Sequence, residues 1–397
     1  MAQLSKRAAQ MPASPIRRLV PFADAARGRG VHVHQLNIGQ PDVPTPRGMI
    51  EAYQAYDEEV LAYGPSQGLP ELREAVADYW RGAGGEVVAE NVSITFGGSE
   101  AALFALAAVA DPGDEVLTTE PFYANYLGFA TMGGLTLRAV PASAAEGFHL
   151  PSDDVIEASI GPRTKAVVIS NPGNPTGTVY TPDEMSRLGA LVEKHGLYLI
   201  SDEVYREFAY GAPVTSALSL PIAAERVIVV DSVSKRFSAC GARVGAVISP
   251  HPDLSAAFMR MSFARLCPAT VDQRAALAAY STPPEYFAEV VAEYEKRRDT
   301  LVDGLRAIPG VETYRPEGAF YTVPTFPVDD CDRFAQWLLT DFAHEGETVM
   351  MAPASGFYSR PELGRQQARM AYVLGVPALE RSLSALRAAL AVYPGRV

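Results

Sequence analysis

Between residues 92 and 250, short apolar runs alternate with segments of helical character. Five of these runs are rich in β-branched or other apolar residues, and each closes on a polar or glycine-containing segment, as buried strands do. They are Val92–Phe96, Ala166–Ser170, Leu197–Ser201, Val227–Asp231 and Val244–Ser249. Because these runs lack a polar face, we expect five parallel strands that are covered on both sides.

Two segments between these strands have the end signals of helices. Ser99 to Ala110 is stopped by Asp111-Pro112-Gly113, and Asp183 to His195 ends at Gly196. Proline and glycine at these positions are typical of helix ends. Strands that alternate with helices at this spacing predict an α/β unit with a mainly parallel central sheet.

The two ends of the chain have a different pattern. After Pro283-Pro284, a charged helix from Glu285 to Leu305 leads into a region where strands and helices no longer alternate cleanly. The segment through Pro46 is rich in proline and arginine, and we expect it to wrap over another part of the fold or another subunit. We therefore predict an N-terminal arm with part of a small domain (1–46), a large domain (47–283) and a small C-terminal α+β domain (284–397).

Composition excludes several classes of protein. The 397 residues are 48% hydrophobic and 20% charged, which is typical of a folded globular protein. A net charge of -12 argues against nucleic acid as a partner. The longest apolar stretch, Ala101 to Ala110, is far shorter than the roughly 20 residues of a membrane span, so we expect no membrane partner.

Cysteines and the N-terminus bear on the compartment. Cys240, Cys267 and Cys331 are too few for a disulfide framework and are not spaced as metal ligands, so we expect them to be reduced, buried and inert, with no metal bound. The N-terminus lacks the apolar segment of a secretory signal, and a cytoplasmic location is expected. The absence of acidic residues before Asp24 leaves an organelle-targeting segment as an alternative.

Unusual polar residues follow the predicted strands, where open α/β sheets bind ligands. After Val92–Phe96 comes Gly97-Gly98-Ser99-Glu100, a glycine pair that enters a helix N-terminus and suits a phosphate. An ordinary turn capped by Ser99 is the alternative. After Ala166–Ser170 comes a rigid loop, Asn171 to Gly177, with two prolines, two glycines and two asparagines, which a structural turn would also explain.

Two further strand ends carry charged side chains. Asp202-Glu203-Val204-Tyr205 puts a carboxylate at a strand terminus and a phenol three residues later, although a solvated acidic pair is possible. Ser232-Val233-Ser234-Lys235 is followed by Arg243 between two glycines. This arrangement suits an amine held against an electrophile with an anion beside it, whereas a surface lysine is the default reading of any single lysine.

These motifs, in this order and spacing, resemble the pyridoxal-phosphate (PLP)-dependent aminotransferases of class I/II and fold type I. The resemblance covers nearly the whole chain, from Leu36–Asp42 through Tyr63–Gly68 and Pro121–Tyr126 to Ala368–Tyr372. It implies a three-layer α/β fold with a smaller α+β domain, PLP as cofactor, and a two-step ping-pong exchange between an amino acid and a 2-oxo acid.

The resemblance also implies roles for single residues. Lys235 would carry the cofactor as a Schiff base and then move the substrate proton, and Asp202 would keep the pyridine nitrogen protonated. Tyr205 and Asn174 would bind the ring's 3-oxygen, and Tyr123 would stack on the ring. The phosphate would be held by Gly98, Ser99, Glu100, Ser232, Arg243 and, from the second subunit of a homodimer, Tyr63. The substrate carboxylate would be held by Arg369 with the Gly39 N–H and Asn174.

Some features refine the resemblance. Glu100 stands where the family more often has a neutral residue, and we expect its side chain to point outward. Met350–Phe357 and Lys235–Gly241 are most similar to a bacterial aspartate aminotransferase branch, which favours aspartate and 2-oxoglutarate. A dicarboxylate needs a second cation, and the candidates are Arg265, Arg360, Arg17 and Arg18.

Two other functions are compatible with the same residues. A PLP-dependent carbon-sulfur lyase or related enzyme would use nearly the same cofactor groups, because the cofactor supplies the electron sink in each case. A non-catalytic ligand-sensing module is the third reading, although the residues before Gly39 leave no room for an appended DNA-binding domain.

Overall fold

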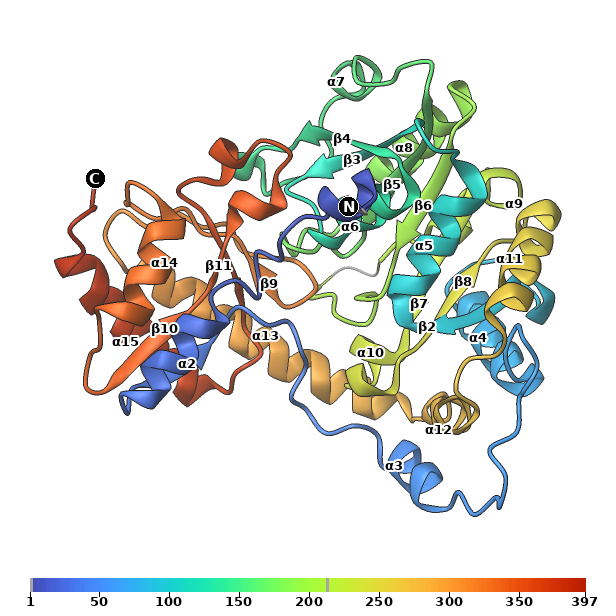
Figure 1. The fold of residues 1–397 in the computed structure, drawn as a ribbon, viewed down its shortest axis with the longest axis horizontal. Helices are drawn as coiled ribbons and strands as arrows, with labels where there is room; N and C mark the ends of the chain where they lie inside the picture. The colour runs from blue at the N-terminus through green and yellow to red at the C-terminus, as the bar shows by residue number, and fades with distance from the viewer. Residues whose placement is uncertain (1–2, 212–213) are drawn as a thin grey trace.

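The computed structural model describes residues 3–211 and 214–397, which form a mixed α/β fold (Figure 1). Its centre is a seven-stranded sheet in the order β2-β8-β7-β6-β5-β3-β4. The strands are β2 (Val92–Phe96), β3 (Glu115–Glu120), β4 (Thr136–Pro141), β5 (Thr164–Ser170), β6 (Tyr198–Asp202), β7 (Val227–Ser232) and β8 (Val244–Ile248).

Most of this sheet is parallel, which confirms the predicted fold class. β4, β3, β5, β6 and β7 pair in parallel, whereas β8 runs antiparallel to both β2 and β7. The prediction that Val244–Ser249 is parallel to its neighbours is therefore wrong. Only residues 233–243 join β7 to β8, and a parallel pair needs a crossover of roughly a dozen or more residues, usually with a full helix.

Alternate residues of the strands face two different layers of helices. In β5, Ala166 and Val168 pack on one side of the sheet, and Val167 and Ile169 pack on the other. Both faces are thus buried, as the unbroken apolar runs predicted. One face is covered by α5 (Gly97–Val109), α6 (Asn125–Gly133) and α11 (Pro252–Arg265), and the other by α3 (Arg47–Gln54), α4 (Pro70–Gly82), α8 (Pro182–Lys194) and α12 (Thr270–Ala279).

The helix ends follow from local sequence. Thr181 caps α8 by accepting a hydrogen bond from the Glu184 N–H, and the Glu184 side chain accepts from the Thr181 N–H in return. Pro182 at the first helical position has no N–H to leave unsatisfied. The helices predicted at 99–110 and 183–195 agree with α5 and α8 to within two residues, which is the usual uncertainty of helix ends.

A separate hydrophobic core lies away from the large sheet, in a second part of the molecule that the two ends of the chain form together. There β1 (His32–Gln35) pairs in parallel with β10 (Glu347–Met350), so the N-terminal segment packs on the C-terminal part of the chain. The boundaries expected near residues 46 and 283 stay a prediction. The remaining elements of this part are α2 (Val20–Gly28), α13 (Pro284–Arg306), α14 (Cys331–Thr340), α15 (Val376–Val392) and the small antiparallel sheet β11 (Ala352–Pro353), β12 (Ala368–Ala371) and β9 (Tyr321–Thr322).

Short helices complete the fold, and the cysteines lie unpaired within it. Cys331 is buried as expected, but Cys240 and Cys267 are partly exposed, so the expectation that all three are buried is wrong. Across the described residues, no helix has both the length and the apolar character needed to cross a membrane. The short helices are α1 (Lys6–Ala9), α7 (Asp153–Glu157), α9 (Ala223–Arg226) and α10 (Val233–Arg236).

Candidate active site

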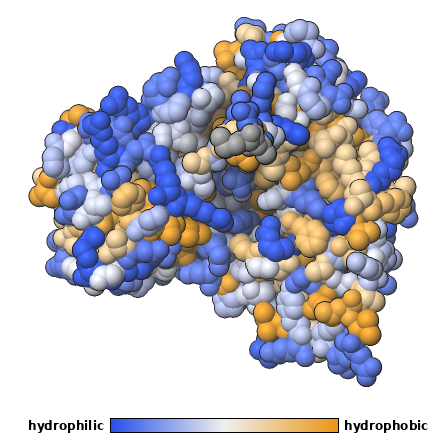
Figure 2. Space-filling view, viewed as in Figure 1, coloured by the Kyte–Doolittle hydropathy of each residue, from blue (hydrophilic) through white to orange (hydrophobic). Residues whose placement is uncertain are grey.

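The polar residues predicted at strand ends come together at one edge of the large sheet. Because β2, β5, β6 and β7 share one direction, the segments that follow them meet at the same edge. The second part of the molecule faces this edge: the Lys235 amine donates to the Gly39 carbonyl at 2.7 Å, and Arg369 donates to Asn174 at 3.0 Å. Figure 2 shows the surface hollowed between the two parts, with hydrophilic residues in the hollow.

Lys235 lies on α10, directly after β7. Its amine is partly buried and lies 5.9 Å from the ring centre of Tyr205 and 5.8 Å from that of Phe320. The only side-chain atom within its hydrogen-bonding range is the sulfur of Cys240, at 3.7 Å, among the described residues. The amine is thus held in a partly desolvated place by a single strong acceptor, the Gly39 carbonyl.

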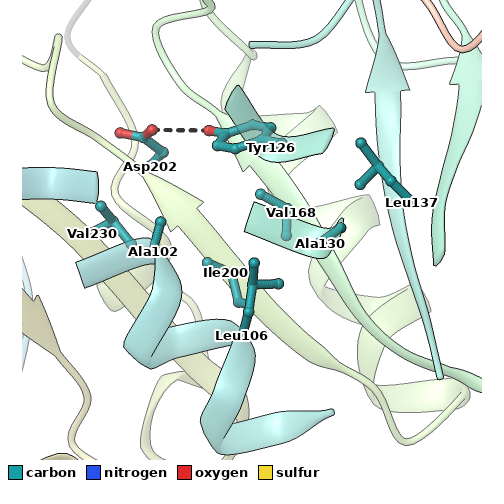
Figure 3. Close-up of a pocket in the computed structure, with 9 residues that line it drawn as sticks. All are labelled: Ala102, Leu106, Tyr126, Ala130, Leu137, Val168, Ile200, Asp202 and Val230. Atoms are coloured by element: carbon teal, nitrogen blue, oxygen red, sulfur yellow. Dashed lines mark hydrogen bonds between the residues drawn. The ribbon is translucent and has the colours of Figure 1, made fainter. Parts of the chain in front are cut away.

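Asp202 ends β6 above a narrow apolar cavity (Figure 3). Its Oδ2 accepts a hydrogen bond from the Tyr126 hydroxyl at 2.9 Å, and Val168, Ile200 and Val230 line the cavity beneath it. Burial among these side chains raises the pKa of Asp202 to about 6, although the Tyr126 hydrogen bond opposes the shift. A positively charged group placed beside Asp202 would favour the ionised carboxylate.

A chain of hydrogen bonds joins the sheet edge to the second part of the molecule. The Asn174 amide donates to the Tyr205 hydroxyl at 3.4 Å, and that hydroxyl bonds to the hydroxyl of Tyr321 at 2.8 Å. The Asn174 side-chain oxygen accepts from Arg369. Burial raises the pKa of Tyr205 well above its usual range, so the phenol keeps its proton and can donate.

Arg369, on β12, is almost completely buried, with 1% of the residue exposed. Its Nη2 donates to the Asn37 carbonyl at 2.6 Å, and its Nε has no hydrogen-bond partner. The guanidinium lies over the rings of Tyr321 and Phe357, at 4.5 Å and 5.0 Å from their centres. Within residues 3–211 and 214–397, no carboxylate forms an ion pair with it, so its partners are neutral.

The start of α5 provides free backbone N–H groups next to a cation. Gly97 has a φ of +71°, which favours glycine, and a side chain there would overlap the Arg243 guanidinium. Arg243 is exposed and donates to the Cys240 carbonyl at 3.1 Å. A helix N-terminus beside an arginine is a suitable site for a phosphate.

Comparison with known proteins decides the family. The model of the family "Aminotransferase class I and II" matches residues 31–371. The chain is a class I and II aminotransferase. The aspartate/prephenate aminotransferase of Thermus thermophilus is 34% identical over 94% of this chain and 100% of its own length. The resemblance seen in the sequence is therefore confirmed.

Solved structures have the same fold over nearly the whole chain. Aspartate aminotransferase from Thermus thermophilus with maleate gives a TM-score of 0.89 at 31% identity, over 98% of this chain and 100% of the other. Alanine aminotransferase from Pyrococcus furiosus gives 0.89 at 31% identity, over 97% and 99%. Pyridoxal phosphate is a general property of the family. The lyase and ligand-sensing alternatives are not favoured.

Two phosphate candidates of the aminotransferase have other partners in the structure. The Ser232 hydroxyl caps α10 by accepting from the Ser234 N–H and lies 3.0 Å from the Val244 carbonyl, to which it donates. Glu100 does not point outward as expected: its carboxylate accepts from the Phe96 N–H and pairs with Arg265 at 3.5 Å. The charge of Glu100 is thus balanced by a cation rather than by solvent.

The remaining predicted residues differ in exposure. Tyr123 is partly buried and accepts a hydrogen bond from the Asn125 amide at 2.7 Å, and burial raises its pKa to about 12. Tyr63 lies far out on the surface, with 83% exposed. Two of the arginines considered for a second substrate carboxylate have partners within the chain. Arg265 donates to the Ile94 carbonyl at 2.9 Å and pairs with Glu100, and Arg18 pairs with Asp332.

Sequence reasoning missed three aromatic residues of the site. Tyr126 binds Asp202, Tyr321 binds Tyr205 and covers Arg369, and Phe357 covers Arg369 from another side. A side chain at Gly39 would overlap the Tyr321 ring, which shows how closely the N-terminal segment approaches it. Tyr126 and Phe357 did lie inside motifs of the family resemblance. This signal was weak, because aromatic residues are common in any core.

Proposed function

We propose that this aminotransferase binds pyridoxal phosphate at Lys235 and exchanges an amino group between L-aspartate and 2-oxoglutarate. The observation that carries the proposal is the meeting of an amine, a buried carboxylate and a buried arginine with neutral partners at one sheet edge. Buried charges that meet at one sheet edge are a strong sign of a ligand site.

The residues present fit the cofactor. Arg369 Nε is a buried donor without a partner, and the Asp202 carboxylate is desolvated without a described cation in ion-pair contact, so both sites gain from a bound ligand. Pyridoxal phosphate supplies an aldehyde for amines and a ring that accepts electrons from the substrate α-carbon. Its protonated ring nitrogen would pair with Asp202, and Tyr123 would cover the ring.

The phosphate would lie where α5 begins. The Gly98, Ser99 and Glu100 backbone N–H groups would donate to it, and Arg243 would supply the positive charge. The Ser232 hydroxyl would join by turning away from the Val244 carbonyl. Because Glu100 is paired with Arg265, its carboxylate would add little repulsion at the phosphate.

Lys235 would move the proton at the substrate α-carbon. Its amine has one strong acceptor, the Gly39 carbonyl, so it can leave that acceptor to act on a substrate. Tyr205 and Asn174 would orient the cofactor by binding its 3-oxygen, and both side chains are fixed by their own hydrogen bonds. Fixed donors of this kind need little rearrangement during the reaction.

Arg369 would bind the substrate α-carboxylate. Its planar guanidinium matches a carboxylate with two parallel hydrogen bonds, and the Tyr321 and Phe357 rings keep water away. The Gly39 N–H and the Asn174 amide would assist. Every α-amino acid carries this carboxylate, so Arg369 selects the class of substrate and not its side chain.

Aspartate needs a further cation for its second carboxylate. Relatives named aspartate aminotransferase support this substrate, including that of Geobacillus stearothermophilus at 30% identity over 96% of the chain. Arg265 and Arg18 hold acidic side chains of the chain itself, whereas the Arg17 and Arg360 side chains make no hydrogen bond or ion pair with any described residue. We therefore assign the second carboxylate to Arg17 or Arg360.

We further propose a cytoplasmic homodimer in which Tyr63 contributes to the phosphate site of the second subunit. The exposure of Tyr63, with Val60 at 70% and Leu61 at 75% beside it, supports an interface there, because clustered apolar exposure marks contact surfaces. The three unpaired cysteines fit a reducing compartment. The domain boundaries after residues 46 and 283 belong to the same proposal.

A spectral screen of the PLP-loaded enzyme against single amino acids tests the function. L-aspartate should convert the bound cofactor to its aminated form and release one oxo acid per site, with L-alanine as the comparison that lacks the second carboxylate. A spectrum unchanged by every amino acid contradicts the proposal, and release of ammonia in place of an oxo acid would indicate a lyase.

A further inference from the structure

The residue after the proposed catalytic lysine has an unusual environment. The Arg236 side chain is 1% exposed, and its Nη2 pairs with Asp231 Oδ1 at 2.9 Å. Its Nη1 donates to the Tyr280 hydroxyl at 3.2 Å, and its guanidinium lies 3.7 Å from the centre of the Tyr79 ring. We call Arg236, Asp231, Tyr79, Trp80 and Tyr280 the Arg236 box.

Asp231 closes the box from the other end of the same segment. Its Oδ1 also accepts from the Ser232 N–H at 2.7 Å, and its Oδ2 accepts from the Trp80 indole at 3.2 Å. Asp231 lies four residues before Lys235, and Arg236 lies one residue after it. The ion pair therefore brackets the whole turn that carries the lysine.

The walls of the box belong to helices far away in the chain. Tyr79 and Trp80 lie on α4, Tyr280 is the C-cap residue of α12, and these two helices pack on each other. The Tyr79 hydroxyl also binds the Glu207 carboxylate. Glu207 follows Tyr205 by two residues, so the box connects the lysine turn to the loop that holds the site's tyrosine.

The lysine turn cannot hold its own orientation well. α10 has only four residues, and a single helical turn has little stability by itself. Successive residues of a helix project about 100° apart, so fixing the side chain at position 236 fixes the direction at position 235. In this orientation the Lys235 amine donates to the Gly39 carbonyl at 2.7 Å.

We propose that Arg236 is a positioning residue: its ion pair with Asp231 between the Tyr79 and Tyr280 rings fixes the rotation of α10 and so the direction of the Lys235 amine. This inference rests on the proposed function of Lys235. It assigns the box a role in the rate of reaction, because a misplacement of about 1 Å at a reacting group costs as much as about 100-fold in rate.

The main test is the double variant Asp231→Asn/Arg236→Met in the PLP-loaded enzyme. Removing both charges avoids an unpaired buried carboxylate, so the chain should still fold. We expect kcat to fall about 10- to 100-fold while KM for L-aspartate stays within about threefold, since Arg369 is untouched. The visible circular dichroism of the bound cofactor should change, because it reports the orientation of the group that the lysine holds.

A conservative variant keeps the inference testable if the double variant does not fold. Arg236→Lys keeps the positive charge beside Asp231 but loses the planar group that reaches Tyr280 and stacks on Tyr79. We expect a folded enzyme with a smaller loss of kcat and a shifted dichroism signal. Wild-type kcat and dichroism in Arg236→Lys would overturn the positioning role.

A matched control uses a second buried arginine. Arg298, on α13, pairs with Glu295 at 3.0 Å and lies 4.8 Å from the centre of the Tyr210 ring. Arg298→Met should lower thermal stability but keep kcat and the cofactor signal. An equal loss of kcat in this control, or a folded double variant with wild-type kcat, overturns the inference. A wild-type enzyme without exchange activity would instead refute the proposed function.

Discussion

Two buried arginines, Arg236 and Arg369, differ in the partners that the fold gives them. Arg236 lies in the Arg236 box, where Asp231 balances its charge at 2.9 Å. Arg369 has an amide oxygen and a backbone carbonyl as its acceptors, and its Nε has none. Both residues are at most 2% exposed, so burial does not distinguish them.

The difference lies in the missing counter-charge. Moving a charge out of water costs several kcal/mol, and a buried ion pair recovers much of that cost. At Arg236 the chain supplies the partner itself, which makes the pair structural. At Arg369 the described chain supplies only neutral acceptors, and in the proposed function the anion is the substrate carboxylate.

The most severe way to break the site is Lys235→Ala. It removes the amine that would act first as nucleophile and then as base, and we expect exchange activity to fall by more than about 10⁴-fold. The fold should be retained, because the amine makes one hydrogen bond to the Gly39 carbonyl. Oxo acid formation measures the loss, and Lys194→Ala on the surface of α8 is the control that should stay active. Full activity in Lys235→Ala would refute the assignment.

Removing each arginine tests the comparison directly. Arg236→Met leaves the Asp231 charge buried and unpaired, so the free energy of unfolding should fall by about 3 to 5 kcal/mol. Arg369→Met leaves no such charge behind and should cost less than half as much in the cofactor-free chain. Denaturant unfolding of both variants measures the difference, and equal losses would contradict the view that only Arg236 is structurally paired.

Asp202→Asn keeps the shape of the side chain but removes its charge. The hydrogen bond from Tyr126 can persist, whereas the ring nitrogen of the cofactor would lose its proposed counter-ion. We expect kcat to fall about 10²- to 10³-fold, as for other lost electrostatic partners of a reacting group. Glu203→Gln is the control, since Glu203 binds Ser201, Ser216 and the Ala217 N–H and does not face the site. An equal effect in that control would contradict the role of Asp202.

The same carboxylate predicts a pH dependence of stability in the cofactor-free chain. Burial raises the pKa of Asp202 from 3.8 to about 6, so the folded state binds the proton more tightly than the unfolded state. Its contribution to stability is present below about pH 4 and is lost as the pH rises through 6, by up to about 3 kcal/mol. Asp202→Asn should therefore lose less stability than wild type between pH 4 and 7. If denaturant unfolding gave the same dependence of the free energy of unfolding on pH for both proteins, this prediction would be refuted.

Arg369→Lys is the mildest of these changes. The charge remains, but a lysine cannot form two parallel hydrogen bonds with a carboxylate. We expect KM for L-aspartate to rise about 10- to 100-fold with a smaller change in kcat, which corresponds to the loss of a charged hydrogen bond. Steady-state kinetics measure it. An unchanged KM would place the carboxylate elsewhere and remove the contrast between the two arginines.

The strand pattern shows where sequence reasoning works and where it stops. The five predicted strands exist, because long apolar runs need burial whatever the topology. The predicted direction of β8 was wrong, because an apolar run contains no information on whether its strand is parallel or antiparallel to its neighbours. β3 and β4 were missed: β3 is bounded by Glu115 and Glu120, which are buried and bind Arg163 and Ser359, and β4 is an edge strand with exposed residues.

The sequence by itself determined which candidate site residues lie together at one edge of the sheet. Asp202 ends a strand, and Lys235 and Asn174 lie in the segments that follow two others; a strand end is a local feature that fixes where the next residues project. Only the tertiary structure decided the partners of each charge: Asp231 for Arg236, Arg265 for Glu100, and neutral groups for Arg369. These partners come from distant segments or from the folding back of a turn, so no local pattern could reveal which buried charge has a charged partner and which has only neutral ones.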